Sequence, residues 1–118
     1  MHYLATRIRV NLNGGAKEFY NLFEFRLRDH DFKLQDEVIN GAKYWYFHNH
    51  AIWYADGGWR LGKAEDSGTE NSVLFAPGMK DDLPGDLRGQ WSYWNPDRNE
   101  WVKARDDIVK VRWYFYYY

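Results

Sequence analysis

The sequence predicts an all-β fold, either an antiparallel sandwich or a small flattened barrel of about seven to eight short strands. Apolar and polar residues alternate with a period of two in several short runs, and apolar residues rarely recur at the spacing of a helix. Turn signals rich in Asn, Asp and Gly separate these runs. Aromatic residues make up 20% of the chain, so rings must supply much of the core.

Two strands are expected near the N-terminus. Residues 3–12 alternate charged and apolar side chains, and the Asn-Gly-Gly run at 13–15 then tolerates the positive φ of a turn. Residues 19–27 alternate again and are expected to form a strand, although a helix beginning within residues 17–22 is the alternative. The polar run 28–37 is expected to be a loop.

A meander of three short strands is expected in the middle of the chain, over residues 44–48, 51–55 and 59–61. An Asn-Gly turn signal at 40–41 precedes this meander, and an Asp-Gly-Gly signal at 56–58 interrupts it. Loops of two to three residues suit tight hairpins, so neighbouring strands should be antiparallel.

The second half begins with a long, mostly exposed connection, residues 62–90, in which the apolar run 72–76 is expected to be a short strand. Residues 91–94 and 100–104 flank the run Asn-Pro-Asp-Arg-Asn, which is typical of a turn, and are expected to form a hairpin. A last strand is expected over residues 107–118.

The length of 118 residues suits a single domain, expected to span residues 1–118. The chain has 16 Lys and Arg residues against 17 Asp and Glu residues, and the two signs are interleaved. A nucleic-acid partner is not expected, because such binding needs clustered cations. The nearest clusters, Arg7 with Arg9 and Lys110 with Arg112, are interpreted as solvent-facing sides of strands.

The chain contains no cysteine, which excludes disulfides, thiolate metal sites and a thiol nucleophile. No apolar run has the length of a secretory leader or of a membrane-spanning segment. We therefore expect a soluble protein without membrane insertion, unless a leader has been removed, and no cofactor is predicted.

The order of these landmarks resembles a Tyr/Trp-rich β module found repeatedly in large multidomain proteins of dinoflagellates, other algae and protists. The resemblance covers about residues 24–111, and the matching positions are Asn40, Gly41, Trp45, Ile52 to Tyr54, Trp59, Gly62, Trp91, Trp94 and Trp101. Lys43 stands where the family usually has Pro, and Arg60 occupies a slot that is usually apolar. The resemblance implies an accessory or interaction module without catalytic residues or a cofactor.

The triplet His48-Asn49-His50 raises the question of a metal or nuclease site. A His-x-His pair on one strand places both imidazoles on the same face, but Zn²⁺ still needs a third protein ligand and supporting residues. A nuclease of the type named for these letters takes its ligands from dispersed positions. The triplet lies where a hairpin must reverse, and we interpret it as a turn.

The long connection is rich in carboxylates, which are Glu65, Asp66, Glu70, Asp81, Asp82 and Asp86. Calcium prefers several oxygen ligands, but this spacing matches no EF-hand, and acidic loops are usually solvated. No pair of acids stands out as a glycosidase site. Ser67, Ser72 and Ser92 lie in no nucleophile elbow, so no catalytic residue is predicted.

Adjacent rings such as Trp53 and Tyr54, or Tyr93 and Trp94, must face opposite sides of their sheet. A two-layer domain buries only one side of each sheet, so some rings should be exposed or covered by a partner, unless long loops fold over them. Exposed indoles can stack on sugar rings. The candidate sugar-stacking residues are Trp53, Trp59, Trp91 and Trp94.

The C-terminal run is unusual because chain ends are normally polar and frayed. It consists of Trp113, Tyr114, Phe115, Tyr116, Tyr117 and Tyr118. Left as a free edge, such a run would pair with other chains. It is either a sealed strand inside the domain or the surface where a partner docks.

These features favour a non-enzymatic interaction or structural module that self-associates, or docks on a protein scaffold, through aromatic and β-edge contacts. The alternative function is carbohydrate binding at exposed Trp platforms. A small enzyme ranks third, because no acid, base or nucleophile can be distinguished.

Overall fold

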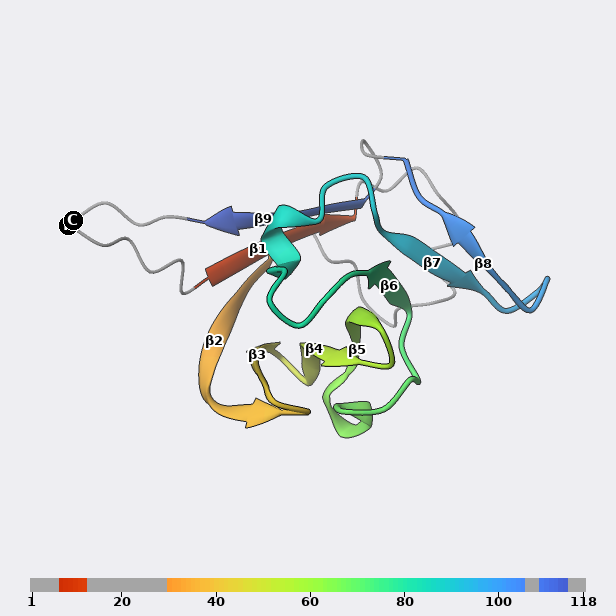
Figure 1. Ribbon diagram of the computed structural model, residues 1–118. Coiled ribbons are helices and arrows are strands. Elements are labelled where there is room, and N and C mark those ends of the chain that lie inside the picture. Colours follow the sequence, from red (N-terminus) through yellow and green to blue (C-terminus); the bar gives the residue numbers. More distant parts are fainter. Residues whose placement is uncertain (1–6, 13–29, 106–108, 115–118) are drawn as a thin grey trace.

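The computed structural model describes residues 7–12, 30–105 and 109–114, and shows nine strands in one antiparallel sheet (Figure 1). The strands are β1 (Arg7–Leu12), β2 (His30–Ile39), β3 (Ala42–Phe47), β4 (His50–Ala55), β5 (Gly58–Lys63), β6 (Leu74–Pro77), β7 (Ser92–Asn95), β8 (Glu100–Lys103) and β9 (Val109–Tyr114). Two short 3₁₀ turns, η1 (Ala64–Asp66) and η2 (Pro84–Asp86), lie in the connections. In the described part of the chain, no helix is long and apolar enough to cross a bilayer.

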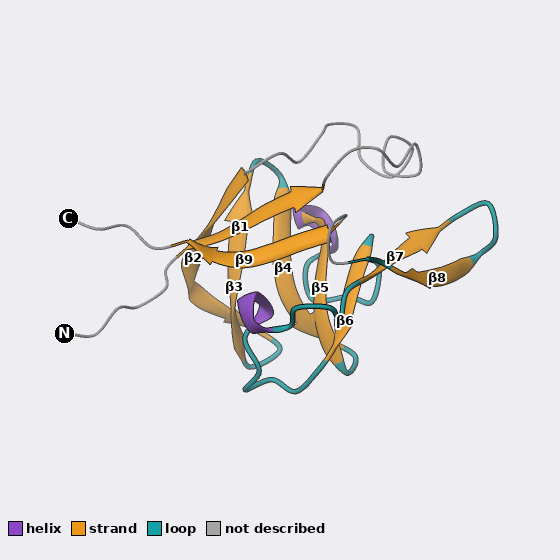
Figure 2. Ribbon diagram, turned by 90° about the horizontal axis from the view of Figure 1, so that it is seen from above, coloured by secondary structure: helices purple, strands orange, loops and turns teal. Residues whose placement is uncertain are grey.

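The strands are ordered β8-β7-β6-β5-β4-β3-β2-β1-β9, and every neighbouring pair is antiparallel. The sheet curls strongly, so that β1 and β9 cross over the strands in the middle of the sheet (Figure 2). The predicted all-β, antiparallel class is confirmed. The described residues form nine strands, and a single sheet curls into a half-barrel where two packed sheets or a flattened barrel were expected.

The meander β3–β4–β5 confirms the expected strands and turns, with boundaries shifted by one or two residues. Tight turns connect β2 to β3, β3 to β4 and β4 to β5, and both central residues of each turn have positive φ. The φ values are 54° and 80° at residues 40–41, 40° and 62° at residues 48–49, and 50° and 82° at residues 56–57. This is the geometry of a type I′ turn, which matches the twist of the flanking strands. Asn, Asp and Gly tolerate it, which explains the sequence signals at 40–41 and 56–57.

The expectation of a loop over residues 28–37 is wrong where the structure describes it, because residues 30–39 form β2. Phe32 and Leu34 pack into the core of the sheet, while Lys33 lies exposed between them. The register with β3 then shifts between Leu34 and Val38, and Val38 is exposed. Because only Phe32 and Leu34 mark the buried side of this strand before the register shift, its sequence is as polar as that of a loop. The turn expected at 13–15 and the strand expected at 19–27 lie outside the described residues.

The main core covers one face of the sheet, here called the inner face, which carries Ile8, Val10, Phe32, Trp45, Ile52, Trp59, Leu61, Leu74, Tyr93 and Val111. Trp45 packs edge-to-face against both Trp59 and Trp113, with 5.8 Å between ring centroids in each pair. Residues 78–90 cross this face: the indole N–H of Trp59 donates to the carbonyl of Asp82, and that of Trp113 donates to the Asp86 carboxylate at 2.8 Å.

A second, smaller core lies on the opposite side, here called the outer face, where Trp53 packs with Ala51 and Ala55. Residues 64–73 fold over these side chains, and the Trp53 indole N–H donates to the carbonyl of Thr69 at 2.8 Å. The Asn40 side-chain amide donates to the carbonyls of both Tyr54 and Gly68, which ties this loop to the sheet. Many residues of the connection 62–90 are exposed, as expected, but its two halves also cover opposite faces of the sheet.

The remaining expected elements are present. The apolar run 72–76 contributes the short strand β6, and β7 with β8 forms the expected hairpin, which extends beyond the rest of the sheet (Figure 2). Asn95 begins the turn of this hairpin, and its side-chain oxygen accepts hydrogen bonds from the backbone N–H groups of Asp97 and Arg98. The last strand is confirmed over residues 109–114, and residues 115–118 lie outside the described part.

Candidate functional site

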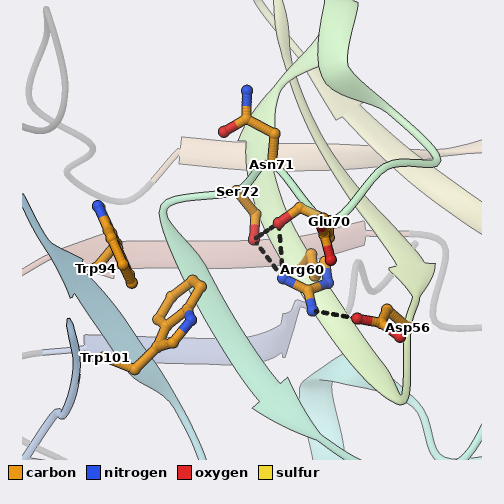
Figure 3. A pocket seen from close by; sticks show the side chains of 7 residues that line it. All are labelled: Asp56, Arg60, Glu70, Asn71, Ser72, Trp94 and Trp101. Atoms are coloured by element: carbon orange, nitrogen blue, oxygen red, sulfur yellow. Dashed lines mark hydrogen bonds and ion pairs between the residues drawn. The ribbon is translucent and has the colours of Figure 1, made fainter. Parts of the chain in front are cut away.

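A cavity of about 560 Å³ opens on the outer face, between β5, the loop after it and the β7–β8 hairpin. We call it the outer cavity. Trp94 and Trp101 line one side and form the ring wall, while four polar residues line the other and form the polar wall (Figure 3). The polar wall consists of Asp56, Glu70, Asn71 and Ser72, and Arg60 lies among these side chains.

The ring wall is a cross-strand pair. Trp94 of β7 lies opposite Trp101 of β8, and their rings meet edge-to-face with 5.4 Å between centroids. Trp101 is 37% exposed and rests against Phe75 of β6, with 5.8 Å between ring centroids. Neither indole N–H of the pair donates a hydrogen bond to a group in the described residues. The wall thus offers flat apolar surface with polar edges.

Gly58 leaves space for the ring of Phe75, against which Trp101 packs. A Cβ on Gly58 would lie 2.3 Å from the carbonyl oxygen of Ala76 and 2.4 Å from Cε2 of Phe75, closer than real Cβ contacts. Only glycine therefore allows β5 and β6 to pair here with Phe75 lying over the strand.

Arg60 is the structural centre of the site. Its Nε–H donates to the carbonyl of Ala55 at 2.9 Å, and its Nη1 donates to the carbonyl of Glu70 at 2.9 Å and to the hydroxyl of Ser72 at 3.0 Å. The guanidinium carbon lies 4.3 Å from the centroid of the Phe75 ring, a cation–π contact. These bonds fix the loop 70–72 and hence the polar wall.

The electrostatics of the outer cavity are net negative. Burial lowers the pKa of Arg60, while the charges of Asp56 and Glu70 partly oppose that shift, and the guanidinium stays protonated at neutral pH. The Arg60 side chain is only 7% exposed, whereas the Asp56 side chain, 3.9 Å away, is 71% exposed. A ligand entering the cavity therefore meets carboxylate before it meets guanidinium.

The polar wall holds groups that the described chain does not use. The Glu70 carboxylate and the Asn71 side-chain amide take part in no hydrogen bond with another described residue, and Asp56 makes only its long ion pair with Arg60. The backbone N–H of Asn71 donates to the Thr69 hydroxyl at 3.1 Å, which fixes the direction of the loop. Two carboxylates and one amide thus belong to residues that line the outer cavity, and Arg60 lies between Asp56 and the rings (Figure 3).

Three of the four predicted sugar-stacking residues are not exposed. Trp53, Trp59 and Trp91 are 0%, 1% and 2% exposed, because the two halves of the 62–90 connection cover both faces of the sheet. These three rings cannot act as platforms in this conformation, and that part of the prediction is corrected. Trp94 does line the outer cavity.

Sequence reasoning missed Trp101 and Arg60 as site residues. Pairing the two arms of the predicted 91–94/100–104 hairpin across its turn would have placed Trp101 opposite Trp94, so a signal for Trp101 existed. The sign for Arg60 was weaker: it occupies a slot that is usually apolar in the resembled module, but an arginine between apolar strand positions is normally a solvent-facing residue.

The predicted interface at the C-terminus is described only in part. Trp113 packs within its own subunit, against Trp45 and so close to Gly85 that a Cβ there would lie 2.7 Å from the indole. The backbone of Tyr114 pairs with Arg7 in β1. Phe115, Tyr116, Tyr117 and Tyr118 lie outside the described residues.

The histidine triplet is a turn, as interpreted: residues 48–49 reverse the chain between β3 and β4. The ring of His50 is buried, and its Nδ1–H donates to the carbonyl of His48 at 3.0 Å. The acidic residues of the connection are divided between the two loops that cover opposite faces. Across the described ranges, no group of three or more potential metal ligands comes together.

The basic residues of β1 and β9 face outward, as expected from the alternation. The register brings the two pairs together, because Arg9 lies opposite Arg112 and Asn11 lies opposite Lys110. Arg9 also pairs with Asp31 of β2, at 2.9 Å. The local sequence around these residues did not indicate that β1 and β9 pair.

Comparisons with protein-family models, with curated proteins and with solved structures each found no match. The resemblance to the Tyr/Trp-rich module therefore stays a prediction.

Proposed function

We propose that this chain is a non-catalytic carbohydrate-binding module whose binding site is the outer cavity. The observation that carries the proposal is a cavity of about 560 Å³ that is lined by two indoles and by carboxylate, amide and hydroxyl side chains. A pyranose ring has an apolar C–H face that stacks on an indole, and rim hydroxyls that need hydrogen-bond partners. The ring wall supplies apolar surface for the C–H face, and the polar wall supplies hydrogen-bonding groups for the hydroxyls.

Other classes of ligand fit this cavity less well. A phosphate or nucleotide needs accessible cations, but the buried guanidinium of Arg60 already donates from Nε and Nη1 to protein oxygens, and two carboxylates stand beside it. A purely apolar ligand would desolvate the Asp56 and Glu70 carboxylates without pairing them, which is unfavourable. A neutral or cationic polyhydroxylated ligand avoids both costs.

Isothermal titration calorimetry against a panel of oligosaccharides tests the proposal. Replacement of Trp101 by alanine is expected to weaken binding by about tenfold or more, since an aromatic anchor typically contributes more than about 1.4 kcal/mol. Tyr46→Ala is the matched control, because Tyr46 is 38% exposed but lies on β3, away from the cavity. The proposal fails if no oligosaccharide binds, or if both variants lose affinity equally.

Self-association or scaffold docking through the C-terminal run is a second candidate. It is favoured by the place of β9 in the sheet: it is an edge strand, paired on one side with β1 and on the other with no described strand. An unpaired strand edge can add a strand from another chain. Such docking could use Tyr114 and residues 115–118, since Trp113 packs in its own subunit.

Light scattering after size-exclusion chromatography tests this second candidate. The full chain should form a dimer or larger assembly. A chain ending after Tyr114 retains β9 but lacks residues 115–118, so it should associate more weakly than the full chain. A full chain that stays monomeric at high concentration would rule out self-association, and pull-down with candidate scaffolds would then be the remaining test of docking.

A further inference from the structure

We infer that the outer cavity selects sugars that carry a protonated amine, such as glucosamine units, over neutral or acidic sugars. This inference rests on the proposed carbohydrate-binding function and adds to it the charge of the ligand. It comes from the charges, exposures and hydrogen bonds of the cavity's own residues.

The charge of the lining favours a cation. Two carboxylates, from Asp56 and Glu70, line the cavity against one guanidinium, that of Arg60. The positive charge is the less accessible of the two signs, because the Arg60 side chain is 7% exposed and the Asp56 side chain 71%. An ammonium group placed beside these carboxylates is attracted, and a sugar carboxylate or sulfate is repelled.

The hydrogen-bonding capacity of the lining points to the same ligand. An ammonium group has three donors and no acceptor. The Glu70 carboxylate is an acceptor with no hydrogen-bond partner in the described chain, and Asp56 has only its 3.9 Å ion pair. Arg60 has little to offer an anionic sugar, since Nε and both protons of Nη1 already reach protein oxygens.

The ring wall adds a third preference for positive charge. Tryptophan is the aromatic side chain with the strongest cation–π attraction, and Trp94 and Trp101 line the cavity that the carboxylates share. The indole faces can hold the C–H face of the sugar while an amine on the same sugar reaches across to the carboxylates. A neutral hydroxyl in the same position gains only a hydrogen bond.

The test is a titration of the full chain with two matched hexasaccharides, one β-1,4-linked glucose and one β-1,4-linked glucosamine, which differ at C2 by hydroxyl against amine. At about pH 5.5 the amine of the sugar is protonated, and the glucosamine oligomer is expected to bind about tenfold more tightly. At about pH 9, above the pKa of about 8 that is usual for such amines, the preference for the glucosamine oligomer should disappear.

The outcomes separate the inference from the function on which it rests. If the glucose oligomer binds as tightly as the glucosamine oligomer at the lower pH, the inference is overturned and carbohydrate binding stands. If neither oligomer binds, nor any oligosaccharide of the panel, both are overturned. A preference that persists unchanged at the higher pH would also overturn the inference, because the charge would then not be its cause.

Charge-removing variants test whether the preference arises in the cavity. Asp56→Asn and Glu70→Gln are each expected to weaken glucosamine-oligomer binding about fivefold and to leave the glucose oligomer nearly unchanged. Asp56→Asn is structurally mild, because asparagine also accepts the φ of 50° at this turn. Asp81→Asn, the same change in the loop that covers the inner face, is the control. An equal loss in Asp81→Asn would contradict a local origin.

Discussion

The guanidinium carbon of Arg60 lies 4.3 Å from the centroid of the Phe75 ring, on the face of the sheet opposite the main core. A charged side chain thus occupies a buried position in the outer cavity and connects the two walls. It holds the loop 70–72 by hydrogen bonds on one side and packs on the aromatic row that ends in Trp101 on the other.

Arg60→Lys is expected to lower the free energy of unfolding by about 1–3 kcal/mol, because lysine keeps the charge but cannot reach the three acceptors that the planar guanidinium reaches. Urea denaturation followed by tryptophan fluorescence measures the change. Arg98→Lys, at a side chain that is exposed in the β7–β8 turn, should stay within about 0.5 kcal/mol of the parent. Equal midpoints for both variants would contradict a structural role for Arg60.

Gly58→Ala is expected to destabilise the protein by about 2 kcal/mol or more, because the added Cβ would overlap the Ala76 carbonyl and the Phe75 ring. The neighbouring Gly57→Ala separates steric overlap from backbone strain. Gly57 has a φ of 82° and no atom within 4 Å of an added Cβ, so its cost should be about 1 kcal/mol. Thermal unfolding of the two variants should show the larger loss at Gly58, and the reverse order would count against this packing.

Trp53→Phe is expected to loosen residues 64–73 more than the rest of the protein. The substitution removes the indole N–H that bonds the Thr69 carbonyl and leaves space in the small outer core, at a cost of about 2–3 kcal/mol. Hydrogen exchange resolved by residue should show faster exchange in this loop, with little change in β1 and β9. Uniform acceleration across the sheet would mean that the outer core is not a separate stabilising unit.

Trp113→Phe is expected to lower stability by about 1–2 kcal/mol, because it breaks the hydrogen bond to Asp86 and reduces the contact with Trp45. Asp86→Asn is the matched partner variant and should cost less than about 1 kcal/mol, since the amide oxygen can still accept the bond. Chemical denaturation compares them. If Trp113→Phe left the free energy of unfolding unchanged, this ring would not stabilise its own subunit, and the case for docking at the C-terminus would be stronger.

The hairpins of the fold could be predicted from local chemistry. Asn40-Gly41 and Asp56-Gly57 carry the positive φ values of type I′ turns, and the strands between them have a clear alternation. β2 could not be predicted in this way. Only Phe32 and Leu34 mark its buried side before the register shifts, so its strand identity comes from pairing with β1 and β3.

The exposure of the rings was predicted less well, for a physical reason. Alternation correctly places Trp53 and Tyr54 on opposite faces, but it does not reveal that a loop crosses each face. Loop coverage depends on long-range hydrogen bonds such as that from Asn40 to the carbonyl of Gly68. The outer cavity depends in the same way on Arg60, whose burial is determined by partners distant in the chain.

An NMR titration of the indole N–H resonances tests the central claim most directly, because each tryptophan gives its own signal. With the oligosaccharide that binds most tightly, the signals of Trp94 and Trp101 should shift in a saturable manner, while those of the buried Trp53 and Trp59 stay in place. No shift with any oligosaccharide, or shifts confined to other tryptophans, would contradict sugar binding in the outer cavity.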